Sequence, residues 1–181
     1  MATKLTELEG CALGLIWETG TSTIYAVRKV FEKSPNPYWS GSAGAIYPLV
    51  RRLEDRDLVR AREDYTGQRR RVLYELTAKG LRSFRRWLGP RAPDWSVTIP
   101  VDPLRSRIRF LGALKPSDRA EFLANAERHL KAQIKEARTR FKSFDPGEDP
   151  YRYLVPRGVA ITAQARLTWI REAMELLCHS G

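Results

Sequence analysis

The sequence has little of what enzymes, metal sites and secreted folds require. It contains two cysteines and two histidines among 181 residues, too few for a disulfide framework or a zinc site. Cys11 and Cys178 each stand in an apolar helical pattern and are interpreted as core thiols. His129 and His179 have no patterned partner, and no Walker loop, Gly-x-Gly-x-x-Gly fingerprint or nucleophile elbow is present. We therefore expect no enzyme activity, no metal and no resident cofactor.

Long hydrophobic runs are also missing. None approaches the roughly 18 to 20 residues that span a bilayer, and residues 1–9 lack the apolar segment of a secretory signal. We therefore expect a cytoplasmic protein that does not enter membranes.

Basic residues are abundant instead. The chain has 32 basic and 21 acidic side chains and a net charge of +11, which favours a polyanionic partner, nucleic acid ahead of a membrane surface. Residues 1–89 hold 16 basic and 10 acidic side chains, and the remainder holds 16 and 11. Bulk charge therefore does not locate the binding site.

Turn residues divide the chain into segments. Glycine and proline punctuate a stretch over 89–100 that has no helical period. We predict one domain over 1–88, a linker or arm over 89–102, and a helical domain over 103–181. A turn over 145–150 separates two long helical patterns in the last of these.

The first domain begins with three helical patterns. Thr6 and Glu9 form a T-x-x-E capping box at the start of the first helix. The hydroxyl residues of 21–23 supply caps for a second helix, which the prolines of 35–37 should stop. A third helix is predicted to begin around Ser42. Three short helices in about fifty residues outline a helix-turn-helix.

A hairpin and a closing helix follow. Strands are predicted over Leu58–Glu63 and Arg71–Leu76, separated by a basic tip over 64–70. Thr77 caps a helix whose apolar residues recur every three or four positions. The predicted fold is mainly α with a small β-hairpin: an N-terminal winged helix-turn-helix followed by a C-terminal α-helical dimerisation domain.

The dimerisation assignment depends on two amphipathic patterns, at about 116–142 and 157–178. Each carries an apolar seam with three- and four-residue spacing. The seam residues assigned to the interface are Leu123, Leu130, Ile134, Phe141, Leu167, Ile170, Met174 and Leu177. A dimer would set two recognition helices roughly one DNA turn apart. The alternative is a helical hairpin within one chain.

Several short motifs resemble a known family. They are Ser42–Leu49 (SAGAIYPL), Arg52–Glu54 (RLE), Leu58-Val59 and Tyr74–Gly80 (YELTAKG). These motifs are similar to those of PadR-like regulators, over roughly residues 5 to 88 and more weakly through Trp169. The resemblance implies that the Ile-Tyr-Pro segment starts the recognition helix and that the C-terminal helices form the dimer. It further implies a ligand- or stress-responsive regulator, with a repressor of a palindromic operator as the expected form.

Two positions depart from that family pattern. Many relatives have Gln, Ser or Thr where this chain has Ala45, so the operator sequence cannot be carried over. Many have Gly where this chain has Asp57, and Asp tolerates the left-handed conformation that a helix end can need.

The candidate base-reading surface lies on the third helix. Ser40, Ser42 and Tyr47 are the polar groups near its expected N-terminus, where recognition helices read bases and attract phosphate. Arg51 and Arg52 lie about one turn further on, and adjacent helical positions point about 100° apart. We expect one of them to reach the DNA backbone. For Tyr47 the alternative is a packed aromatic side chain with a solvated hydroxyl.

Other DNA contacts are expected at the hairpin tip and the second helix. Arg69, Arg70 and Arg71 suit the minor groove or nearby phosphates, although such a run can also be a solvated face. Tyr25 and Arg28 are secondary phosphate candidates, with Tyr25 equally suited to the core. A winged helix that only binds proteins is the alternative function, and it gives no reason for three clustered arginines.

An effector site is also considered. Five aromatic residues could line a pocket for a small flat ligand, although core packing is the favoured interpretation for them: Trp39, Trp95, Tyr151, Tyr153 and Trp169.

Overall fold

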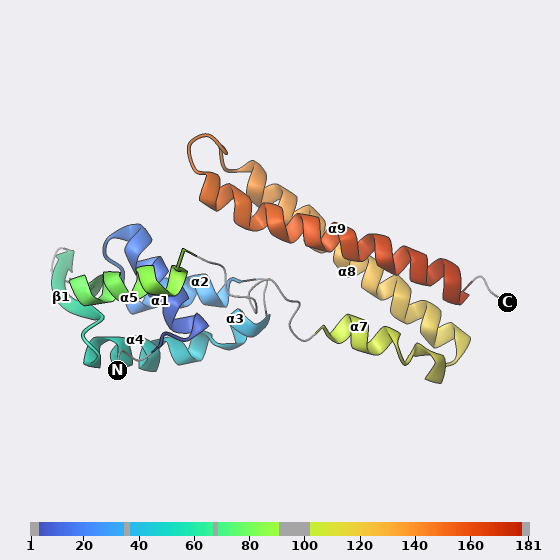
Figure 1. The fold of residues 1–181 in the computed structure, drawn as a ribbon, viewed down its shortest axis with the longest axis horizontal. Helices are drawn as coiled ribbons and strands as arrows, with labels where there is room; N and C mark the ends of the chain where they lie inside the picture. The colour runs from blue at the N-terminus through green and yellow to red at the C-terminus, as the bar shows by residue number, and fades with distance from the viewer. Residues whose placement is uncertain (1–3, 35–36, 67–68, 91–101, 179–181) are drawn as a thin grey trace. The chain divides into compact units, whose positions relative to one another are not determined.

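A computed structural model describes residues 4–34, 37–66, 69–90 and 102–178 of the chain (Figure 1). Its internal contacts divide it into two units, Met1–Ile99 and Pro100–Gly181. Helices dominate both units, and the strands in the described residues form one antiparallel hairpin. No helix in those ranges is long and apolar enough to cross a membrane.

The first unit has the element order of a winged helix. Its elements are α1 (Glu7–Thr19), α2 (Ile24–Glu32), α3 (Pro37–Gly41), the 3₁₀ turn η1 (Ala43–Ala45), α4 (Ile46–Asp55), β1 (Val59–Thr66), β2 (Arg69–Leu76) and α5 (Ala78–Leu88). The predicted capping box is confirmed, because the Glu9 carboxylate accepts from the Thr6 amide at 2.9 Å and the Thr6 hydroxyl accepts from the Glu9 amide at 3.3 Å.

The third predicted helix starts later than expected. Pro37 opens the short helix α3, since a proline needs no amide partner at a helix start. The chain then passes through η1 before α4 begins at Ile46. Ser40 therefore lies in α3 and Ser42 precedes η1, so the predicted start around Ser42 was wrong.

The hairpin is longer than predicted. Its register runs from Val59 opposite Leu76 to Thr66 opposite Arg69. Backbone pairing continues through the polar residues because their side chains stand on the exposed faces, where charge does not oppose it. Arg69 and Arg70 are thus part of β2, and the tip itself lies outside the described residues.

The C-terminus of α4 is closed by a residue with a left-handed backbone. Asp57 has φ +58°, as its place in the motif predicted. The Leu58 amide donates to the Leu53 carbonyl and the Asp57 amide to the Glu54 carbonyl, both at 2.8 Å. This is the Schellman arrangement, which satisfies carbonyls that a helix end leaves open.

The core of the first unit joins its helices to the hairpin. Its largest fully buried side chains include Phe31, Leu13, Ile16, Ile46, Leu49 and Leu53. The buried Glu9 carboxylate forms an ion pair with the Arg56 guanidinium at 2.8 Å. This pair links the start of α1 to the end of α4. The orientation of α4 is therefore fixed by both apolar packing and an ion pair.

The second unit is a helical hairpin with a short helix before it. It contains α7 (Pro103–Ile108), the 3₁₀ turn η2 (Leu111–Ala113), α8 (Pro116–Lys142) and α9 (Pro150–Cys178). α8 has the predicted bounds, whereas α9 begins earlier than the predicted 157, because Pro156 is accommodated inside it. Phe141 contacts Tyr153, and Glu127 pairs with Arg171, so the two helices run antiparallel.

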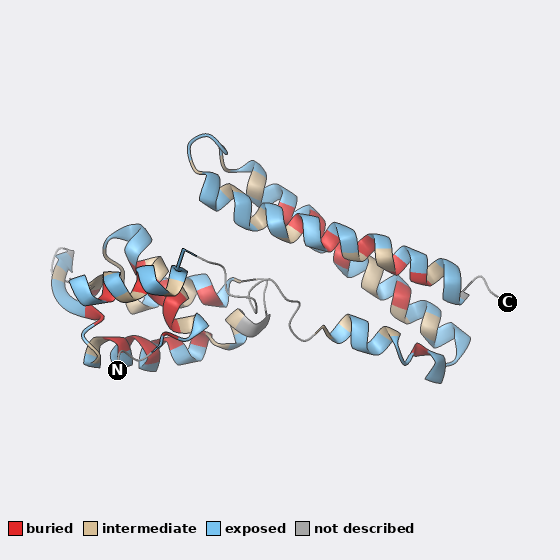
Figure 2. Cartoon of the chain, viewed as in Figure 1, coloured by how far each residue is buried: buried red, intermediate tan, exposed pale blue. Residues whose placement is uncertain are grey.

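The predicted seams of α8 and α9 face each other within one chain. Leu123, Leu130, Ile134, Leu167 and Ile170 are all buried in a single cluster. Figure 2 shows buried residues along the facing sides of the two helices. The hairpin that was left as an alternative is thus present. Dimerisation stays a prediction. These five side chains are buried within one chain as long as the two helices pack against each other.

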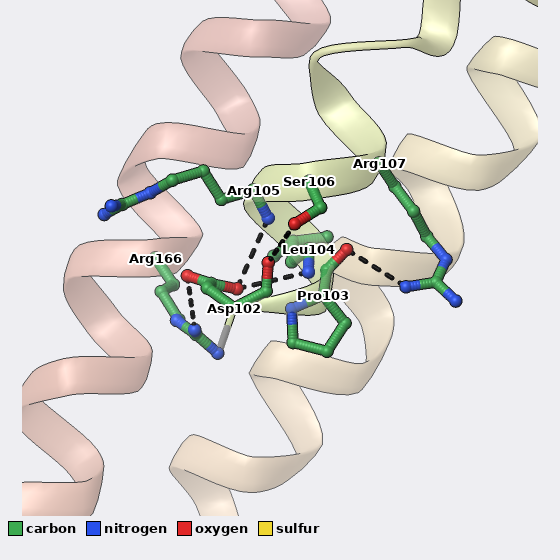
Figure 3. A network of polar contacts seen from close by, with 7 residues as sticks. All are labelled: Asp102, Pro103, Leu104, Arg105, Ser106, Arg107 and Arg166. Carbon is green, nitrogen blue, oxygen red and sulfur yellow. Dashed lines mark hydrogen bonds and ion pairs between the residues drawn. The ribbon is translucent and has the colours of Figure 1, made fainter. Parts of the chain in front are cut away.

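The Asp102 side chain connects α7 to α9 through hydrogen bonds and an ion pair (Figure 3). Its carboxylate caps α7 by accepting from the amides of Leu104 at 3.1 Å and Arg105 at 3.3 Å, and it pairs with Arg166 at 2.7 Å. Burial alone would raise the pKa of Asp102, but these amides and the guanidinium hold the pKa below its usual value.

Candidate nucleic-acid interface

The helix α4 presents one apolar and one polar face. Ile46, Leu49, Val50 and Leu53 are buried, which directs the intervening positions outward. Tyr47 is 41% exposed, which leaves its hydroxyl accessible and fits either a phosphate contact or a packed ring with a solvated hydroxyl. It stands in the first turn of α4, directly after η1.

Two arginines extend this outward face. Arg51 and Arg52 are both exposed, and neither makes an ion pair among the residues that the structure describes. The surface formed by Tyr47, Arg51 and Arg52 is here called the α4 surface. Ser40 and Ser42 are half-buried and precede α4 in the chain.

The helix α2 contributes an exposed aromatic ring. Tyr25 is 56% exposed, so it is not a core residue, and the Lys29 ammonium lies 5.5 Å from its ring centre. Arg28 is 3.6 Å from the Glu32 carboxylate, one turn further along. Arg28 is therefore partly neutralised by its own helix.

The hairpin arginines have acidic partners that the sequence analysis missed. Arg70 pairs with Glu63 and Arg71 pairs with Asp64 across the two strands. The hydrogen bond from Arg71 lowers the pKa of Asp64 below its ordinary value. The side chain of Arg69 lies outside the described residues. The signal that could have revealed these pairs was the register, which sets Asp64 directly opposite Arg71.

Several aromatic residues considered for an effector pocket have packing roles. Trp39 stacks on Phe31 with 4.8 Å between ring centres, and Tyr153 meets the ring of Phe141 edge-on at 5.5 Å. Tyr151 is exposed, and Trp169 is partly exposed. Trp95 lies outside the described residues. An effector pocket built from this set stays a prediction.

Comparison with protein families matches both units. Residues 13–86 match the transcriptional regulator PadR-like family, and residues 102–178 match the virulence activator alpha C-terminal domain. Residues 13–86 therefore form a PadR-like family domain. A comparison with curated protein sequences gave no match for this chain.

Solved structures share the fold of this chain over nearly its full length. Bacillus subtilis PadR in complex with operator DNA is 19% identical, with a TM-score of 0.81 over 95% of this chain and 99% of its own. PadR in complex with p-coumaric acid is also 19% identical, with a TM-score of 0.75 over 94% and 98%. The Vibrio cholerae virulence activator AphA is 15% identical, with a TM-score of 0.69 over 97% and 100%. This chain therefore has the winged-helix fold with C-terminal helices that these proteins have.

Proposed function

We propose that this PadR-like regulator binds a palindromic DNA operator as a homodimer and represses transcription in response to a ligand or stress. The observation that carries the proposal is the α4 surface, where Tyr47, Arg51 and Arg52 are exposed on a helix whose other face is buried. A helix of this kind, held rigidly by its core, is what enters the major groove in helix-turn-helix proteins.

The proposed division of labour follows from side-chain chemistry. The Tyr47 hydroxyl donates a hydrogen bond to a phosphate. Arg51 and Arg52 reach the DNA backbone or a base edge, since guanidinium groups pair with phosphate and with guanine. Tyr25 and Arg28 on α2 add phosphate contacts, as do Ser40 and Ser42 before α4. The arginines of β2 anchor the hairpin on the neighbouring backbone.

An effector forms part of the proposal. The solved complex of B. subtilis PadR with p-coumaric acid supports a small aromatic ligand for a protein of this fold. Binding of such a ligand would act on DNA affinity through its differential affinity for the two states of the regulator.

The test is operator binding by two variants of the full chain. Tyr47→Ala and Arg51→Ala should each weaken binding by about 1 to 3 kcal/mol, because each removes one contact made only with DNA. The matched control is Arg82→Ala, which removes an exposed arginine from α5. Thermal unfolding of all three proteins should remain close to that of the unmodified chain, since these side chains are exposed.

Unchanged affinity in both variants would reject the assignment of α4 as the recognition helix. If the chain also fails to separate operator from random duplex, the winged helix serves as a protein-interaction module, the second candidate function.

A further inference from the structure

The second unit contains a basic groove that the α4 surface and the hairpin do not use. It lies between α8 and α9 and has a volume of about 410 Å³. Four cations line it, Lys131, Lys135, Arg138 and Lys142, above two buried apolar residues, Ile134 and Leu167. We call this feature the α8 groove.

The cations of the α8 groove share one side of the helix. They recur every three or four residues over about three turns, the spacing that brings side chains to a common face. Lys131 is 2.9 Å from Glu127, a carboxylate that also pairs with Arg171 at 3.0 Å.

No ion pair in the described part of the chain neutralises the other three cations of the α8 groove, which are Lys135, Arg138 and Lys142. Lys142 stands in the last turn of α8, where the helix dipole favours a cation. That effect falls off within one turn, so it does not account for Lys135 and Arg138.

The open shape of the α8 groove favours an extended ligand over a small one. Small-molecule sites enclose most of their ligand, whereas all four cations of the α8 groove are exposed and only its floor is buried. A small anion would neutralise one or two of the cations and leave the others. A linear polyanion can meet all of them, because one DNA strand presents a phosphate about every 3.4 Å along the helix axis.

We propose that the α8 groove binds the phosphodiester backbone of duplex DNA. The inference rests on the proposed function, to which it adds a second, sequence-independent contact outside the winged helix. It also explains why the second half of the chain is almost as basic as the first, with 16 basic against 11 acidic residues after residue 89.

The test compares two triple variants of the full chain. Lys135→Gln, Arg138→Gln and Lys142→Gln together should make the plot of log affinity against log salt shallower by about 2 to 3 units per protomer, for operator and random duplex alike. The control combines Arg105→Gln, Lys115→Gln and Arg128→Gln, which removes the same charge from exposed positions elsewhere in the second unit. The control should leave the slope almost unchanged.

A second measurement reports on the groove directly. Duplex DNA should protect Lys135 and Lys142 of the unmodified chain from acetylation, as read by mass spectrometry, and leave Lys115 reactive. An equal loss of slope in both triple variants would overturn the proposal, because it would show an effect of net charge alone. An unchanged slope without protection of the two lysines would overturn it as well, leaving a solvated face.

The experiment separates this proposal from the previous one. If Lys135 and Lys142 are protected but the chain does not prefer operator over random duplex, the α8 groove binds DNA and the proposed function fails. If Tyr47→Ala abolishes operator preference while the groove triple variant keeps the full salt slope, the proposed function stands and the groove contact fails.

Discussion

Asp57 shows how a single residue sets the end of α4. Its left-handed backbone lets the Asp57 and Leu58 amides close α4, and its carbonyl accepts from the Thr77 hydroxyl at 2.7 Å. A residue with a Cβ is strained in this conformation, although Asp less than most. The chain therefore retains some strain at the junction between α4 and the hairpin.

Relief of this strain is the first prediction at the residue scale. Asp57→Gly should raise the free energy of unfolding by up to about 1 kcal/mol, because glycine adopts positive φ without a steric cost. Asp55→Gly is the control: Asp55 is the last residue of α4 and its φ is not positive, so glycine there relieves no strain and should lower the free energy of unfolding slightly. Urea denaturation measures both. If Asp57→Gly lowers stability as much as Asp55→Gly, the backbone at residue 57 is not strained.

Residues with local signals could be predicted from the sequence. The Thr6 and Glu9 cap and the conformation of Asp57 both follow from contacts within a few positions, so a pattern specifies them. The partners of Arg70 and Arg71 could not be predicted, because they depend on which residue of β1 stands beside each arginine. That information appears only when the register is known.

Among the elements, helix existence was predictable and helix boundaries were less so. The apolar spacing of α8 and α9 indicated both helices, but α9 continues through Pro156 toward the turn. α3 was missed because a proline that ends one helix can also begin the next. The seams were identified correctly as apolar stripes, yet periodicity alone cannot say whether a stripe meets its own chain or a second copy.

The hairpin, or wing, carries a prediction at the scale of the element. In the proposed complex Glu63 and Asp64 would compete with DNA for Arg70 and Arg71. Glu63→Gln and Asp64→Asn should therefore tighten binding to any duplex and steepen the salt dependence. Arg70→Ala should weaken binding and make the salt slope shallower by about one unit per half-site, with little change in operator preference.

Glu7→Gln controls for net charge, because it removes a carboxylate from the first turn of α1. Fluorescence anisotropy over a range of salt concentrations measures all four variants. A change in which operator is preferred, with the slope intact, would mean that the wing reads sequence. Equal tightening by Glu7→Gln would mean that Glu63 and Asp64 act only through overall charge.

At the scale of the whole molecule, the proposed dimer must use a surface that the helical hairpin leaves open. The exposed side of α9 offers apolar residues two turns apart, Leu154 at 58% exposure and Ile161 at 54%. Exposed apolar side chains grouped in this way mark interaction surfaces. A two-fold dimer brings one such face against its own copy, which is also the symmetry that a palindromic operator requires.

The last prediction tests this surface against the seam. Ile161→Lys should convert the dimer to a monomer in sedimentation experiments, because each copy would bring a charge into an apolar contact. Ile134→Ala, in the buried seam, should lower stability by about 2 to 5 kcal/mol and leave the oligomeric state unchanged, since Ile134 packs within its own chain. Gln133→Lys, which adds the same charge at an exposed position of α8, is the control.

Dissociation by Ile134→Ala but not by Ile161→Lys would place the interface at the seam. The two helices of each chain would then have to separate and pack against those of the partner chain. A monomer for the unmodified chain would instead leave each winged helix to find its half-site alone, and operator occupancy would then rise with protein concentration without cooperativity.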